Sequence, residues 1–127
     1  MEAVPCRILA IDPGLRCGWA LWSGGSVIFS GMWELRESEG ERIGQKFCRL
    51  QWYLNGLERP ELVVYEEVAK LWGDAAVKIY AGLVAILTEQ CEVWNIPYRQ
   101  VYQARWRKVL TGKGFVRKED KEKESMD

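Results

Sequence analysis

At two positions in the sequence, an acidic residue directly follows a run of apolar residues. Asp12 follows the apolar residues 8–11, and Glu66 and Glu67 follow residues 61–65, a short β-branched stretch. A lone charge at the end of a buried strand costs free energy unless it has a partner, and a divalent cation is a natural partner for a carboxylate. A turn cap or the start of a solvated loop is the ordinary explanation for either place alone. Because the pattern occurs twice, it favours a site in which Asp12 and a glutamate reach one metal ion.

The residue types that are missing narrow the possible chemistry. The sequence has no histidine, and its four cysteines are scattered without a Cys-x-x-Cys pair. Zinc sites, disulfide frameworks, and Ser-His or Cys-His nucleophilic machinery are therefore poor interpretations. If the chain does chemistry, carboxylates must carry it, most simply with Mg²⁺ or Mn²⁺, which prefer oxygen ligands.

Length and composition predict one folded domain over residues 1–127. Apolar residues make up 48% of the 127, so the chain can bury a core and is not disordered. The 18 basic and 18 acidic residues cancel, so the net charge alone does not indicate a nucleic-acid partner. We see neither a secretion signal nor an apolar run long enough to span a membrane, and we expect a cytoplasmic protein without a membrane partner.

The hydrophobic pattern predicts the elements that position these acids. An acid and a Pro-Gly turn between two apolar runs indicate a β-hairpin over residues 7–22, with Asp12 at its mouth. After it we expect alternating elements: a strand over 26–33, an amphipathic helix with apolar residues from Ile43 to Leu57, a strand over 61–65, a helix over 73–92, a strand over 98–102, and a short helix over 103–110. This order predicts a mixed α/β sheet.

Two local features refine the helices. Ser38 and Glu41 have the spacing of a capping box for the first helix. Gly82 lies inside the second helix, where glycine costs about 1 kcal/mol relative to alanine, and this predicts close packing against a neighbour. Residues 117–127 are charged and nearly free of aliphatic side chains, so we expect a polar tail or an incomplete helix there.

Basic residues gather near the end of the chain. Between residues 99 and 118 there are seven and no acid, and they suit a phosphate backbone, although a solvated helix face is the ordinary alternative. They are Arg99, Arg105, Arg107, Lys108, Lys113, Arg117 and Lys118. Trp72, in the loop after the second acidic motif, is a candidate for stacking on a base.

Three stretches together resemble the RuvC family of Holliday-junction resolvases, and most closely its small phage-type members, within the ribonuclease-H-like superfamily. They read ILAIDPGLRCGWAL, LVVYEEV and QARWRKVLTGKGFVRKEDK. The first motif is shared with sugar kinases, actin-like ATPases and a ribosomal-RNA-processing nuclease family, whereas all three in this order are much more specific. The resemblance implies a ribonuclease-H-like, mixed five-stranded sheet flanked by helices.

The resemblance also implies a function. It points to a homodimeric endonuclease that binds a four-way DNA junction and nicks two strands, with two Mg²⁺ or Mn²⁺ ions at the scissile phosphate. On the matching positions Asp12 is the first metal ligand and bridges the two ions, and Glu66 is the second, with Glu67 the alternative if the alignment slips by one. Arg107 and Lys118 would face the DNA backbone, assisted by Lys113.

One departure from the family concerns the last acids. The family completes its site with one or two further acids on a final apolar helix, and the only aspartates left here are Asp120 and Asp127, neither in an apolar context. We therefore expect weak metal occupancy, and junction binding with little or no cleavage, unless dimerisation brings Asp120 into the site. A sheet face without its last helix would also expose apolar surface, which predicts a dimer or a larger assembly.

Three functions remain in competition at the level of the sequence. The first is a junction-cleaving nuclease. The second is a catalytically impaired module that binds branched DNA, and the third is a ribonuclease-H-like enzyme that processes RNA. A sugar kinase or an actin-like ATPase is the least favoured, because 127 residues cannot hold both lobes of such a fold.

Overall fold

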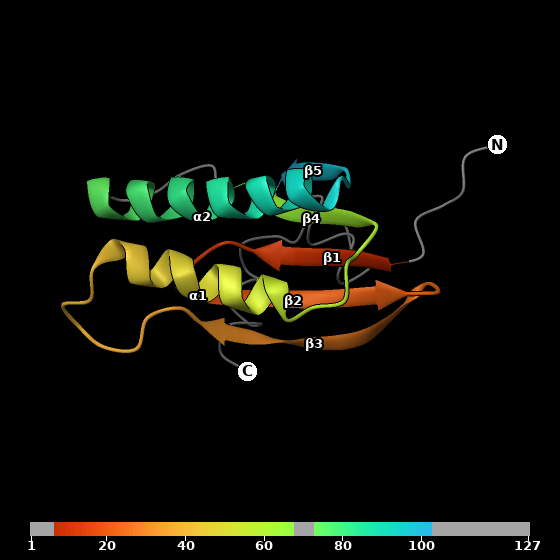
Figure 1. The fold of residues 1–127 in the computed structure, drawn as a ribbon, viewed down its shortest axis with the longest axis horizontal. Coiled ribbons are helices and arrows are strands. Elements are labelled where there is room, and N and C mark those ends of the chain that lie inside the picture. Colours follow the sequence, from red (N-terminus) through yellow and green to blue (C-terminus); the bar gives the residue numbers. More distant parts are fainter. Residues whose placement is uncertain (1–6, 68–72, 103–127) are drawn as a thin grey trace, which may run out of the picture.

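The computed structural model of the chain describes residues 7–67 and 73–102, which form a sheet and two helices. In chain order these are β1 (Arg7–Asp12), β2 (Arg16–Ser23), β3 (Ser26–Glu34), α1 (Ile43–Asn55), β4 (Leu62–Glu67), α2 (Gly73–Trp94) and β5 (Tyr98–Tyr102). Figure 1 shows α1 and α2 side by side on one face of the sheet. The predicted mixed sheet and the order of its elements are confirmed.

The sheet has the order β3-β2-β1-β4-β5, so β1 lies at its centre. The predicted hairpin is present, because β1 and β2 pair antiparallel from Arg7↔Ser23 to Asp12↔Gly18. On its other side β1 pairs with β4 in parallel, as far as Ile11↔Tyr65. A parallel pair needs a long crossover, which α1 supplies.

The alternation of side chains along each strand separates a helix-covered face from the opposite face. Leu9 and Ile11 of β1 are almost completely buried and belong to one core cluster with residues of α1 and α2 such as Leu50 and Leu83. Ala10 and Asp12 therefore point to the opposite face of the sheet. Within residues 7–67 and 73–102, no helix covers that second face.

The start of α1 differs from the predicted capping box. The helix begins at Ile43, and the backbone N–H of Arg42 donates to Gln45 Oε1 at 3.0 Å, so Ser38 and Glu41 do not form the cap. Glu41 instead pairs with Arg49, whose Nη1 donates to Glu41 Oε1 at 2.9 Å. The same Oε1 also accepts a hydrogen bond from the backbone N–H of Glu37 at 3.1 Å. Glu41 precedes the N-cap residue Arg42, whereas a capping box needs its acid at the third helical position.

The close packing predicted at Gly82 is confirmed. A Cβ on Gly82 would lie 2.1 Å from Phe47 Cζ and 2.6 Å from Phe47 Cε1, which no pair of carbon atoms tolerates. The absent side chain therefore lets α2 approach the ring that α1 presents.

Other predictions differ or lie outside the described residues. Strand β4 includes Glu66 and Glu67, so both acids are part of the strand and do not follow it as predicted. The short helix over 103–110 and the polar tail over 117–127 lie outside the described residues, and so does Trp72. In the part of the chain that is described, neither helix is long and apolar enough to cross a membrane.

Candidate functional site

Asp12 and Glu66 lie next to each other at one edge of the sheet. Asp12 and Glu66 lie at the carboxyl ends of β1 and β4, which are parallel. The register pairs Ile11 with Tyr65, so the next residues of the two strands, Asp12 and Glu66, also lie beside each other. Paired residues of neighbouring strands point to the same face, so both carboxylates stand on the face opposite the two helices. Gly18 of β2 pairs with Asp12 on the other side, and even a Cβ there would be 4.0 Å from the Asp12 Cβ. On this face of the sheet, Gly18, Asp12 and Glu66 therefore lie side by side on three neighbouring strands, and the glycine leaves space next to the two acids.

The pleat distinguishes Glu66 from Glu67. Successive residues of a strand point to opposite faces, so Glu67 is directed away from the Asp12 face. Glu66 is thus the glutamate that the structure brings to Asp12. Glu67, the predicted alternative, is not brought to Asp12 in this register. The role of either as a metal ligand stays a prediction.

Burial makes the charged form of Asp12 less favourable than it is in water. Burial raises the pKa of Asp12 above its ordinary value, and a hydrogen bond with Glu66 opposes part of that rise. Two carboxyl groups can share a hydrogen bond only if one of them holds a proton. A divalent cation beside the pair would offset the cost of burying these carboxylates in their charged form.

The pKa of the Cys17 thiol, one residue before Gly18, is also shifted by burial and by Asp12. Its side chain belongs to the core on the other face of the sheet. Burial raises the pKa of the Cys17 thiol to about 12, and the charge of Asp12 adds to that rise. The thiol is therefore neutral at any physiological pH and is no candidate nucleophile.

Tyr80 of α2 fixes the end of β4. Its hydroxyl donates to the backbone oxygen of Glu66 at 3.0 Å, which ties the first half of α2 to the residue that carries the second carboxylate. Tyr80 was not among the predicted site residues. Its place follows from the crossover of the chain between β4 and β5, which no local pattern in the sequence indicates.

The carboxylate pair suits Mg²⁺ or Mn²⁺ in its donor type. Mg²⁺ is commonly bound through one or two carboxylates, with water and substrate phosphate oxygens completing the shell. Asp12 and Glu66 are close enough to supply the two carboxylate ligands of one such ion. Among the described residues no group of three or more acidic, cysteine or histidine side chains could hold a metal ion. A second ion of the kind expected from the sequence would need ligands from elsewhere.

Most of the predicted DNA-binding residues lie outside the described ranges. Arg105, Arg107, Lys108, Lys113, Arg117, Lys118, Trp72 and the candidate acid Asp120 all do so. Arg99 is described. It is exposed in β5 and pairs with Val64, so it stands on the same sheet face as the two carboxylates. The basic segment thus begins on the side of the sheet where the acids are.

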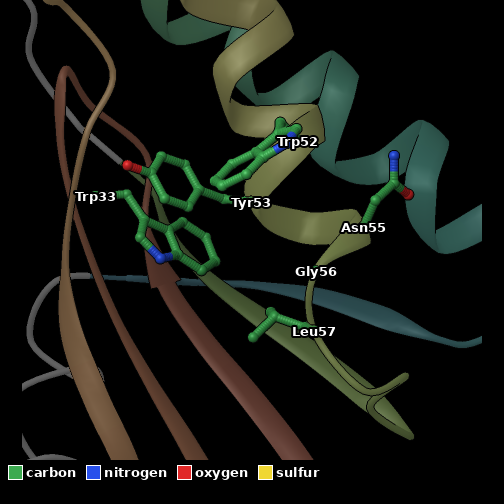
Figure 2. Close-up of a pocket in the computed structure, with 6 residues that line it drawn as sticks. All are labelled: Trp33, Trp52, Tyr53, Asn55, Gly56 and Leu57. Carbon is green, nitrogen blue, oxygen red and sulfur yellow. The ribbon is translucent and has the colours of Figure 1, made fainter.

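A separate cavity lies on the helix-covered side. It has a volume of about 470 Å³ and is lined by residues of β3, α1 and the segment after α1: Trp33, Trp52, Tyr53, Asn55, Gly56 and Leu57. Figure 2 shows the rings of Trp33, Tyr53 and Trp52 gathered together, with Asn55 pointing away from them. Trp33 and Tyr53 stack with their centroids 5.1 Å apart. The lining contains no carboxylate, lysine or arginine, so we assign it no part in the chemistry.

Comparison with solved structures identifies the fold. The Thermus thermophilus RuvC structure matches with a TM-score of 0.69 and 18% identity, over 90% of this chain and 74% of that one. T. thermophilus RuvC in complex with a Holliday junction substrate matches with a TM-score of 0.67 and 18% identity, over 91% and 74%. The yeast mitochondrial Holliday junction resolvase Ydc2 matches with a TM-score of 0.58 and 17% identity, over 86% and 60%. The chain has the ribonuclease-H-like fold of these proteins, as predicted.

Comparisons of sequence alone give nothing further. No family model matches the chain. No curated protein matches it significantly either. The function is therefore argued from the carboxylate pair and the fold.

Proposed function

We propose that this protein is a metal-dependent endonuclease that cuts four-way or otherwise branched DNA. The observation that carries the proposal is the pairing of Asp12 with Glu66 on the open face of the sheet, at the ends of its two parallel central strands. The fold supports it, since the RuvC and Ydc2 structures that share it are Holliday junction proteins. Homodimerisation and binding of a DNA junction are part of the proposal.

The two acids would act through their charge and their placement. Asp12 and Glu66 would hold Mg²⁺ or Mn²⁺, which supplies Lewis acidity toward a phosphate and lowers the pKa of a bound water. The hydrogen bond from Tyr80 holds the backbone oxygen of Glu66, so the point from which the carboxylate extends is fixed before substrate arrives. Arg99 and the basic residues that follow it along the chain would attract the phosphate backbone toward this face.

The test uses a synthetic four-way junction and one matched set of variants. Binding is measured by gel shift in EDTA or Ca²⁺, and nicking is measured in Mg²⁺ or Mn²⁺. We expect wild-type protein to bind the junction in preference to linear duplex, and Asp12→Asn and Glu66→Gln to bind it without nicking. Glu67→Gln is the matched control, because that side chain faces away from Asp12 and should leave nicking close to wild type.

The alternatives give different results in the same experiment. Binding without nicking by the wild-type chain would identify a junction-binding module. Preferential competition by structured RNA would favour an RNA-processing nuclease. Equal competition by linear duplex, or nicking that persists in Asp12→Asn, would overturn the proposal.

Tyr80 provides a finer test of how the site is positioned. A neutral hydrogen bond contributes about 0.5–1.5 kcal/mol, so Tyr80→Phe should raise the Mn²⁺ concentration needed for half-maximal nicking by roughly 2- to 10-fold. Junction binding in EDTA should not change, because the hydrogen bond from Tyr80 lies at the end of β4 beside the carboxylate pair. An unchanged Mn²⁺ requirement would remove Tyr80 from the site.

A further inference from the structure

The aromatic pocket includes one highly exposed indole. This pocket is the cavity of about 470 Å³ described above, between β3 and the end of α1. Its volume falls within the range of roughly 300–1,000 Å³ that is usual for ligand sites. Trp33 in its lining is buried, whereas Trp52 is 72% exposed. Tryptophan is among the residues that contribute most to affinity where a protein surface recognises a partner.

The ring contacts indicate which aromatic surface remains open. Trp33 stacks with both Trp19 and Tyr53, each at a centroid distance of 5.1 Å. Trp52 instead meets Tyr53 at an interplanar angle of 75°, with their centroids 5.2 Å apart. Figure 2 shows Trp52 reaching from α1 toward these two rings. Because this contact is edge-on and Trp52 is largely exposed, a broad face of its indole is free for a ligand to stack on.

The end of α1 gives the pocket a negative polarity. The last residue of α1 and the two residues after it, Asn55, Gly56 and Leu57, line the pocket. The carbonyl groups at a helix C-terminus carry a partial negative charge, which a nearby cation stabilises. The last turn of α1 contains no basic residue. The faces of aromatic rings are also negative, so both features of the pocket attract a cation.

The described basic side chains near the end of α1 in the sequence or bound next to it have other partners. Arg59 Nη1 donates to the backbone oxygen of Trp94 at 3.4 Å. Arg7 pairs with Glu58, the residue after Leu57, at 3.3 Å. Among the described residues that line the pocket there is no arginine or lysine. Phosphate groups would therefore meet no cation here, and this disfavours a nucleic acid as the ligand.

We propose that the aromatic pocket binds an arginine side chain of a partner protein. A guanidinium group is planar and weakly hydrated, so it can stack on the open face of Trp52 while its N–H groups point toward the C-terminal carbonyls of α1. The alkyl part of the arginine would then lie against apolar atoms such as those of Leu57. A lysine ammonium is compact and strongly hydrated, so it would lose more on leaving water.

The position of the pocket separates this interaction from the proposed nuclease site. The pocket lies on the helix-covered side of the sheet, whereas Asp12 and Glu66 stand on the opposite face. A partner bound through an arginine would leave the carboxylate pair accessible. Arginine binding can therefore be measured without DNA, and it does not depend on the proposed function.

Nuclear magnetic resonance titration of the full chain with short capped peptides tests which ligand the pocket takes. Acetyl-Gly-Arg-Gly-amide should shift the indole N–H resonance of Trp52 in a saturable way. The same peptide with citrulline, which keeps the shape of arginine without its charge, should bind roughly 5- to 30-fold more weakly. Equal affinity for these two peptides, or no saturable shift with either, would overturn the proposal. Tighter binding of acetyl-Gly-Pro-Pro-Gly-amide would also overturn it and would identify a proline-rich ligand instead.

Substitutions test the roles of Trp52 and of the helix end. Trp52→Ala should abolish binding of the arginine peptide, and Val93→Ala on α2 is the matched control, because Val93 is equally exposed. Asn55→Lys places a cation at the end of α1 without altering the rings, so it should weaken binding at least about 5-fold, whereas Asn55→Gln should not. Backbone amide resonances away from the pocket report whether each variant keeps its fold. Binding that survives Trp52→Ala, or that is unchanged in Asn55→Lys, would overturn the proposal.

Discussion

Replacing Gly82 by alanine should destabilise the protein, against the ordinary preference of a helix. Alanine in place of a helical glycine gains about 1 kcal/mol from helix propensity. The new Cβ would, however, lie 2.1 Å from Phe47 Cζ, and the ring must retreat by about 1.4 Å to reach ordinary carbon contact. Overpacking of this kind costs about 1–3 kcal/mol. The expected net result is a loss of up to about 2 kcal/mol in the free energy of unfolding.

Two further variants make this prediction decisive. Gly44→Ala in α1 is the matched control, because a Cβ there meets nothing within 4 Å and should stabilise the protein by up to about 1 kcal/mol. In a Phe47→Leu background the smaller side chain leaves room, so Gly82→Ala should become neutral or stabilising. Urea unfolding followed by circular dichroism measures wild type, the two single glycine variants, Phe47→Leu and the Phe47→Leu/Gly82→Ala double variant. If Gly82→Ala proves as stabilising as Gly44→Ala, the close approach of α1 and α2 at this point is refuted.

Two other predictions concern ion pairing and thiol reactivity. The hydrogen bond from Arg49 lowers the pKa of Glu41 to about 2 from its usual 4.5, so this pair stabilises the fold above pH 4.5 and loses its effect as the pH falls toward 2. Arg49→Met should therefore lower the urea midpoint of unfolding at neutral pH. The difference in midpoint between wild type and Arg49→Met should become smaller below pH 4.5, and a difference that stays constant with pH would contradict this prediction. Burial raises the pKa of the Cys17 and Cys91 thiols to about 12, whereas Cys48 is exposed. Cys48→Ser should remove one rapidly reacting thiol in a native thiol–disulfide exchange assay, and serine at either buried position should remove none.

The elements of the fold could be predicted because their patterns are local. The apolar runs of β1, β2 and β4 and the helical spacing in α1 and α2 each follow from a few neighbouring residues. Asp12 and the pair of glutamates could be found in the same way, as acids at strand ends. The likeness of three motifs to the RuvC family then predicted the ribonuclease-H-like fold that the solved structures show.

The choice between Glu66 and Glu67 could not be made from a local pattern. It depends on the register between β1 and β4, and a slip of one residue would exchange the two side chains between faces. Tyr80 was missed for a related reason, since its contact with the backbone of Glu66 joins α2 to the end of β4. The predicted capping box was wrong because α1 begins at Ile43, after both Ser38 and Glu41, and the Glu41 carboxylate binds Arg49 and the backbone N–H of Glu37 instead.

The stacked rings between the sheet and α1 give the protein an optical signature. Trp19 of β2, Trp33 of β3 and Tyr53 of α1 follow one another at centroid distances of 5.1 Å, with interplanar angles of 23° and 8°. Aromatic rings held at fixed mutual angles produce a near-ultraviolet circular dichroism signal that disappears when tertiary packing is lost but secondary structure remains. Because each ring comes from a different element, that signal reports whether α1 is docked on the hairpin. It offers a direct measure of folding for each variant before its binding to DNA is assayed.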